Sequence, residues 1–219
     1  MNLTSKLFSL DKSIAGDLLK NYEFPWECLK DIGKYILEAA LLLPYDFVQI
    51  KENVWVANSA KISLTACIEG PAIICRGAEI RHCAYIRGNV IVGEDAVVGN
   101  STEVKNSILF NDAQVPHFNY VGDSILGYKA HFGAGVITSN VKSDKKNISV
   151  RMEDGSIIPT NLRKFGALVG DFVEVGCNTV LNPGTIIGRN TNIYPLSCVR
   201  GYVKENSIYK RLGEVVDKL

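Results

Sequence analysis

Three side chains that could bind an anion or move a proton lie within one short stretch of the sequence. Arg87 and Lys105 are 18 residues apart, and each directly follows a branched aliphatic residue. His117 comes twelve residues later, three positions before Tyr120. Two cations on neighbouring turns of a chain can hold a phosphate between them, although flexible cations can equally extend into solvent. A neutral imidazole beside them can take a proton from an amine, although a single histidine is more often structural.

A repeat of six residues must position these side chains. Large aliphatic residues recur without a miss at every sixth position: Val56, Ile62, Ile68, Ile74, Ile80, Ile86, Val92, Val98 and Val104. The same interval returns from Val169 to Val199. Neither an α-helix nor a single strand requires this period, whereas short parallel strands wound around a prism do. With three strands per turn, residues 18 apart lie on successive coils, about 4.8 Å from each other. The pattern predicts an all-β solenoid.

Three regions differ in pattern. Residues 1–50 have apolar residues at helical spacing and predict an N-terminal helical segment with two helices, the second from about 26 to 43, between Pro25 and Pro44. Residues 51–205 carry the solenoid, which a long excursion interrupts from Thr138 to Lys164. Residues 206–219 are charged and predict a tail or a short helix capped by Asn206 or Ser207.

Composition narrows the classes of partner and compartment. The net charge of +1 over 219 residues gives no electrostatic reason to expect a nucleic acid or a membrane as partner. We find no apolar run of about 20 residues and no signal peptide, and therefore expect a cytoplasmic protein. The six cysteines show no zinc-ribbon spacing, so we interpret them as small packing residues.

Three segments resemble a known family of enzymes. They are Val104-Lys105-Asn106-Ser107, His117-Phe118-Asn119-Tyr120-Val121-Gly122-Asp123 and Gly133-Ala134-Gly135-Val136-Ile137-Thr138-Ser139-Asn140. They are similar to the acetyltransferase domain of bifunctional glucosamine-1-phosphate N-acetyltransferase/UDP-N-acetylglucosamine pyrophosphorylases and of archaeal-type sugar-1-phosphate nucleotidylyltransferases. The resemblance covers roughly residues 50–205, and residues 22–29 look like the linker that precedes this domain. It implies a left-handed parallel β-helix, a homotrimer and a place in UDP-N-acetylglucosamine biosynthesis.

The resemblance also implies a reaction and roles for single residues. The reaction is acetyl transfer from acetyl-CoA, as cosubstrate, to the 2-amino group of a hexosamine 1-phosphate, and no metal is expected for it. His117 would be the general base, Asn140 would orient the amine or the base, and the Ala134 amide would donate to the thioester oxyanion. Sugar-phosphate binding is implied for Arg87, Lys105, Tyr120 and Lys146, the last reaching a neighbouring subunit's ligand. Cys177 is a candidate for one implied coenzyme A contact, although we favour a packing role for this cysteine.

Departures from the family pattern keep other functions open. His131 stands where the bacterial enzymes have an asparagine, which puts the identity of the substrate in doubt. The Gly-rich nucleotide-binding front domain is missing, so we do not expect pyrophosphorylase activity. One alternative is a degenerate scaffold that binds a sugar phosphate, a nucleotide sugar or a partner enzyme without turnover. Another is a γ-carbonic-anhydrase-like zinc site made by His82, His117 and His131, but Gly122 occupies the position that a close histidine pair requires.

Overall fold

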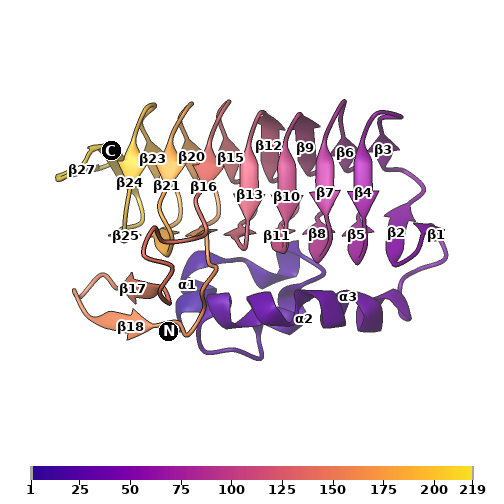
Figure 1. The fold of residues 1–219 in the computed structure, drawn as a ribbon, viewed down its shortest axis with the longest axis horizontal. Coiled ribbons are helices and arrows are strands. Elements are labelled where there is room, and N and C mark those ends of the chain that lie inside the picture. Colours follow the sequence, from indigo (N-terminus) through magenta and orange to yellow (C-terminus); the bar gives the residue numbers. More distant parts are fainter. Residues whose placement is uncertain (1, 219) are drawn as a thin grey trace.

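The computed structural model describes residues 2–218, and these form the predicted solenoid (Figure 1). Within this range, three sheets form the walls of a prism, and each coil adds one strand to each sheet in turn. All pairings between coils are parallel, and the pairings of β1 with β2 and of β26 with β27 are antiparallel. The parallel β-solenoid predicted from the repeat is therefore confirmed, while its left hand remains an implication of the resemblance.

Each sheet stacks its strands in the order of the coils. Sheet A has nine strands: β1 (Phe47–Lys51), β2 (Val54–Ala57), β5 (Ala72–Ile74), β8 (Val90–Val92), β11 (Ser107–Leu109), β14 (Ile125–Leu126), β19 (Ala167–Val169), β22 (Thr185–Ile187) and β25 (Tyr202–Val203). Sheet B has nine: β3 (Lys61–Ile62), β6 (Glu79–Ile80), β9 (Val97–Asn100), β12 (Gln114–His117), β15 (His131–Phe132), β20 (Glu174–Val175), β23 (Asn192–Ile193), β26 (Ser207–Arg211) and β27 (Glu214–Asp217). Sheet C has seven: β4 (Cys67–Glu69), β7 (Tyr85–Arg87), β10 (Glu103–Lys105), β13 (Tyr120–Gly122), β16 (Ile137–Thr138), β21 (Val180–Leu181) and β24 (Cys198–Val199).

The six-residue repeat fills the interior of the prism. Its large aliphatic members pack into one core cluster that runs from Val54 to Tyr209. In sheet A, Val56 pairs with Ile74 and Ile74 with Val92, so successive coils are 18 residues apart. Val92 then pairs with Leu109, which is 17 residues on. The one-residue slips in the middle of the sequence therefore shorten a coil without breaking the stack of inward residues.

The N-terminal segment covers the outer face of sheet A (Figure 1). Its helices are α1 (Leu3–Leu7), η1 (Leu10–Lys12), α2 (Gly16–Leu19), η2 (Pro25–Lys30) and α3 (Ile32–Ala40). Trp26, Ile32 and Ile36 are fully buried there against outward-facing aliphatics such as Ile91 and Ile108. The segment thus packs on the outside of the coil.

The prediction of two continuous helices was wrong in detail. The second is split into a 3₁₀ helix and an α-helix at Asp31, whose φ and ψ of −110° and 0° leave helical geometry. It ends at Ala40 because Leu41 and Leu42 donate to Glu38 and Ala39 three residues back, which tightens the last turn. None of the helices in residues 2–218 is long and apolar enough to cross a membrane.

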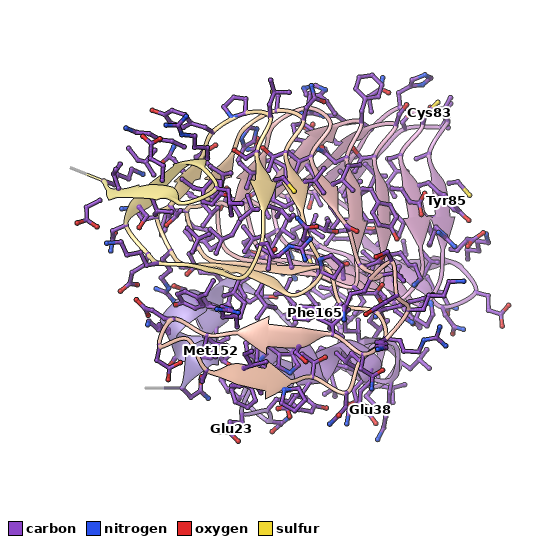
Figure 2. The ribbon with its side chains drawn as sticks, turned by 60° about the vertical axis from the view of Figure 1, so that its left-hand side comes forward. Glu23, Glu38, Cys83, Tyr85, Met152 and Phe165 are labelled. Atoms are coloured by element: carbon purple, nitrogen blue, oxygen red, sulfur yellow. The ribbon has the colours of Figure 1, made fainter. Side chains whose placement is uncertain are left out.

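The excursion and the C-terminal segment complete the chain. The excursion leaves the prism after β16 and returns at β19, and it carries an antiparallel hairpin of β17 (Ser149–Arg151) and β18 (Ile157–Pro159). Figure 2 shows Met152 and Phe165 of this excursion on the same side of the molecule as Glu23 and Glu38, away from Cys83. The short C-terminal helix was predicted wrongly, because residues 207–217 form the hairpin β26–β27 instead. Ser207 and Tyr209 alternate inward and cover the open end of the prism, so the solenoid extends to Arg211 rather than to 205.

Candidate functional site

A column of polar side chains lies on the outer face of sheet C. Pairing of Val104 with Ile86 sets Lys105 beside Arg87 on the next coil, as the 18-residue spacing predicted. Each cation has a carboxylate from its own chain, however. An Nη1 of Arg87 lies 2.6 Å from Oε1 of Glu103, and Nζ of Lys105 lies 3.7 Å from Oδ2 of Asp123. The repulsion expected between the stacked cations is therefore already relieved without a bound anion.

Asp123 is the centre of this polar cluster, and no sequence pattern predicted a role for it. Its carboxylate is 4% exposed and accepts hydrogen bonds from Nδ2 of Asn140 at 2.5 Å and Nδ2 of Asn106 at 2.8 Å. Nδ2 of Asn140 also lies 3.2 Å from the Tyr120 hydroxyl. Asp123 therefore holds Lys105, Tyr120 and Asn140 together, three residues for which the sequence motifs predicted related functions.

The backbone explains why this position suits an aspartate. Asp123 has a φ of +48° and turns the chain from sheet C into sheet A. Asparagine and aspartate tolerate this left-handed conformation better than most residues, and Asn106 occupies the same conformation one coil earlier. Asp123 was visible in the sequence only as the last residue of a motif segment. The partners of the carboxylate were not, because they come from the preceding and the following coil.

Burial and charge also act on Tyr120. Its pKa is raised above that of an ordinary tyrosine, first because the hydroxyl is partly buried and then because the Asp123 carboxylate is close. The hydroxyl therefore keeps its proton at neutral pH and can donate it in a hydrogen bond. A protonated phenol and a lysine ammonium on one face are suited to an anionic ligand.

Three other predicted residues, His117, Ala134 and Cys177, occupy the corner between sheets B and C. The Gly135 amide donates to the His117 carbonyl at 3.0 Å, and the Asn178 amide donates to the Ala134 carbonyl at 2.8 Å. His117, Ala134 and Cys177 thus lie on three successive coils of one edge of the prism. The Ala134 amide donates to no atom in residues 2–218, so it remains free to donate to a ligand.

Two features describe the packing and the backbone at this corner. A side-chain carbon at Gly133 would lie 2.8 Å from the Cys177 nitrogen and 2.9 Å from its sulfur, so only glycine fits there. Phe118, directly after His117, has a φ of +52° although its side chain is 61% exposed. Phe172 and Leu196 adopt the same left-handed conformation at other turns of the prism, so the conformation of Phe118 belongs to the winding of the solenoid and does not single out the site.

Comparisons with known proteins identify relatives of this chain. The family of the GMPPB C-terminal domain matches residues 68–162. The bifunctional protein GlmU of Methanococcus aeolicus is 34% identical over 95% of this chain and 52% of its own length. The bifunctional sugar-1-phosphate nucleotidylyltransferase/acetyltransferase of Sulfurisphaera tokodaii is 34% identical over 85% of this chain and 47% of its own. The chain is a hexapeptide-repeat region homologous to these bifunctional proteins. The resemblance drawn from the sequence is confirmed.

The extent of these matches limits what they show. The chain spans about half the length of these two curated relatives, so their complete activities do not transfer to it directly. Among solved structures, the polySia-specific acetyltransferase NeuO matches 77% of this chain and 88% of its own with a TM-score of 0.45 and 12% identity. That distant likeness has no bearing on the reaction.

Not every predicted site residue joins the cluster in this hexapeptide-repeat chain. Nδ1 of His131 lies 2.8 Å from Oε2 of Glu174 on the outer face of sheet B, away from the Asp123 cluster. Lys146 lies exposed in the excursion, where its amide donates to Asp144. The His117 side chain is exposed and contacts none of the cluster through a hydrogen bond in residues 2–218. One chain therefore assembles only part of the predicted set.

The histidines considered for zinc also have separate partners. Nδ1 of His82 lies 2.7 Å from Oγ1 of Thr65, and its Nε2 lies 3.3 Å from the Cys83 sulfur. His131 interacts instead with Glu174. Over residues 2–218, no three His, Cys, Asp or Glu side chains converge as metal ligands would. The structure offers no support for the carbonic-anhydrase-like alternative.

Proposed function

We propose that the chain is an acyltransferase that moves the acetyl group of acetyl-CoA to the 2-amino group of a hexosamine 1-phosphate. The observation that carries the proposal is the buried Asp123 carboxylate, which gathers Lys105, Tyr120 and Asn140 on one face. The ammonium, the phenol and the amide lie together on one face and could all donate to an anionic sugar. Homology to the two bifunctional proteins supports the class of reaction.

The proposed reaction uses the two parts of the site differently. The amine nitrogen attacks the thioester carbon and forms the amide bond, while the carbon–sulfur bond breaks and coenzyme A leaves as a thiol. His117 takes the proton that the amine loses and passes it to the leaving sulfur, and the free Ala134 amide stabilises the oxyanion. Cys177, on the coil after Ala134, is then placed to contact the cosubstrate.

The sugar phosphate would bind on sheet C. Arg87 and Lys105 would exchange part of their interaction with Glu103 and Asp123 for the phosphate, Tyr120 would donate its hydroxyl proton, and Asn140 would orient the amine. We propose that a homotrimer completes the site, with Lys146 and His131 contributing from a neighbouring chain. This arrangement would give Lys146 and His131 a role although both lie away from the cluster of their own chain.

A thiol-release assay with acetyl-CoA tests the proposal against glucosamine 1-phosphate, galactosamine 1-phosphate and glucosamine 6-phosphate. His117→Ala should lower turnover by about 10² to 10⁴-fold, the usual contribution of a general base. His82→Ala is the matched control, because His82 is also exposed at the same corner two coils away. Turnover that survives in His117→Ala, or that falls equally in both variants, would contradict the assignment of the base.

One observation favours a second function, a scaffold that binds its ligand without turnover. Arg87 and Lys105 are already paired with carboxylates, so the pair attracts an anion less strongly than two free cations would. Saturable binding of glucosamine 1-phosphate without thiol release from acetyl-CoA would identify this function. Light scattering at several protein concentrations measures the molar mass in solution. Comparison with turnover and ligand binding at the same concentrations then shows whether either activity requires the proposed trimer.

A further inference from the structure

A second concave surface lies between the excursion and the last coils of the prism. In Figure 1 the β17–β18 hairpin lies next to the end of the solenoid that carries β21 and β24. The groove between them has a volume of about 720 Å³, within the range of small-molecule sites. We call it the excursion groove, and the residues that matter to its chemistry are Lys142, Asp144, Arg151, Asn182, Arg200 and Gly201.

The arginines of this groove differ from most others in the chain. The sequence has eight arginines, and five of them form ion pairs with carboxylates: Arg76, Arg81, Arg87, Arg189 and Arg211. Within residues 2–218, Arg151 and Arg200 form none, and both line the groove. Lys142 is paired with Asp144 at 3.2 Å. The groove therefore has two more cations than carboxylates.

The two arginines are held close together by the fold. Arg200 donates from Nη2 to Oδ1 of Asn182 at 3.2 Å, and Asn182 is fixed in turn by donating to the Val199 carbonyl at 2.8 Å. A side-chain carbon at Gly201 would lie 4.0 Å from Cβ of Arg151. The hairpin thus places Arg151 directly over the residue that follows Arg200. Both side chains line the same groove, where an anion that reaches the two guanidinium groups would be attracted by both.

We propose that the excursion groove binds the phosphate groups of a nucleotide. Guanidinium groups match phosphate oxygens in a bidentate geometry, and the volume accommodates a diphosphate with an attached nucleoside. Two ligands share this chemistry: the nucleotide end of coenzyme A and a nucleoside diphosphate such as that of a nucleotide sugar. The site does not depend on the proposed acetyl transfer, because binding is measured without turnover.

Calorimetry with inorganic pyrophosphate on the full chain tests the proposal. We expect saturable binding that weakens by about tenfold or more in Arg151→Gln and in Arg200→Gln, the usual effect of losing a charge-assisted hydrogen bond. Arg163→Gln is the matched control: Arg163 belongs to the same excursion, is exposed and forms no ion pair in the described residues, but does not line the groove. Equal weakening in all three variants, or no saturable binding by the unmodified chain, would overturn the proposal.

A variant with the opposite expected sign guards against misfolding. Asp144→Asn removes the carboxylate of the groove and should strengthen pyrophosphate binding several-fold at low salt, an effect that unfolding cannot produce. Weaker or unchanged binding in this variant would contradict the electrostatic basis of the site. Titrations with coenzyme A and with UDP then distinguish the two ligands, since the natural one should bind more tightly than pyrophosphate.

Discussion

The Asp123 cluster makes a sharp prediction for the substitution Asp123→Asn. The carboxylate has two oxygens, and each accepts a hydrogen bond from a different side-chain amide, Asn106 or Asn140. An asparagine at this position offers only one oxygen. In either orientation of its amide, one of the two neighbouring NH₂ groups faces another donor. Asparagine tolerates the φ of +48°, so the substitution changes the hydrogen bonds and leaves the backbone conformation allowed.

The size of the effect follows from the burial of the site. Asp123 is 4% exposed, and a buried donor without an acceptor costs about 1–3 kcal/mol. The surviving hydrogen bond loses its charge assistance, about 1 kcal/mol more. The Lys105 ammonium at 3.7 Å is partly exposed and adds at most about 1 kcal/mol. We expect the free energy of unfolding to fall by about 2–5 kcal/mol.

Denaturant unfolding measures this loss, and the matched control is Asp112→Asn. Asp112 has a φ of +59° but its side chain forms no hydrogen bond or ion pair in residues 2–218, so its change should stay within about 0.5 kcal/mol. If the acetyltransferase proposal is right, KM for the sugar phosphate rises by about tenfold in Asp123→Asn, because Lys105 and Asn140 lose their common anchor. Identical stabilities of the two variants would refute the reasoning.

Three further predictions concern stability. Trp26 is buried, with its ring centroid 4.6 Å from that of Phe24 and 5.9 Å from that of Phe165. Trp26→Ala should lower the free energy of unfolding by about 3–5 kcal/mol, measured by thermal unfolding. A small loss would show that the N-terminal segment folds independently of the prism. Phe118→Asn should raise the free energy of unfolding by about 1 kcal/mol because it relieves the positive φ, and a lower stability would mean that the exposed ring packs in solution. The pKa of Tyr120 is raised in the folded chain, so its contribution to stability is present below the unfolded-state pKa of about 10 and is lost as pH rises through the folded-state pKa. The difference in stability between the unmodified chain and Tyr120→Phe should therefore narrow above about pH 10. A difference that stays constant with pH would contradict the raised pKa.

The repeat made the solenoid predictable because its period is a local property. Each sixth aliphatic residue points inward regardless of what distant coils contain, so Ile74 and Val92 could be stacked from their spacing alone. Helix and strand boundaries at the two ends were less predictable. The charged C-terminal segment fits a helix by its composition, and only the open end of the prism, which Tyr209 covers, favours a strand there.

The sequence by itself determined the prism, the stacking of Arg87 on Lys105 and the family to which the motifs belong, since all three depend on spacing along the chain. Only the tertiary structure decided which cationic side chains are paired with carboxylates. Glu103 and Asp123 neutralise the stacked cations, while Arg151 and Arg200 remain without carboxylate partners in the described residues. Pairing of this kind joins residues from different coils and from the excursion, and its outcome depends on which side chains come within reach after the chain has wound.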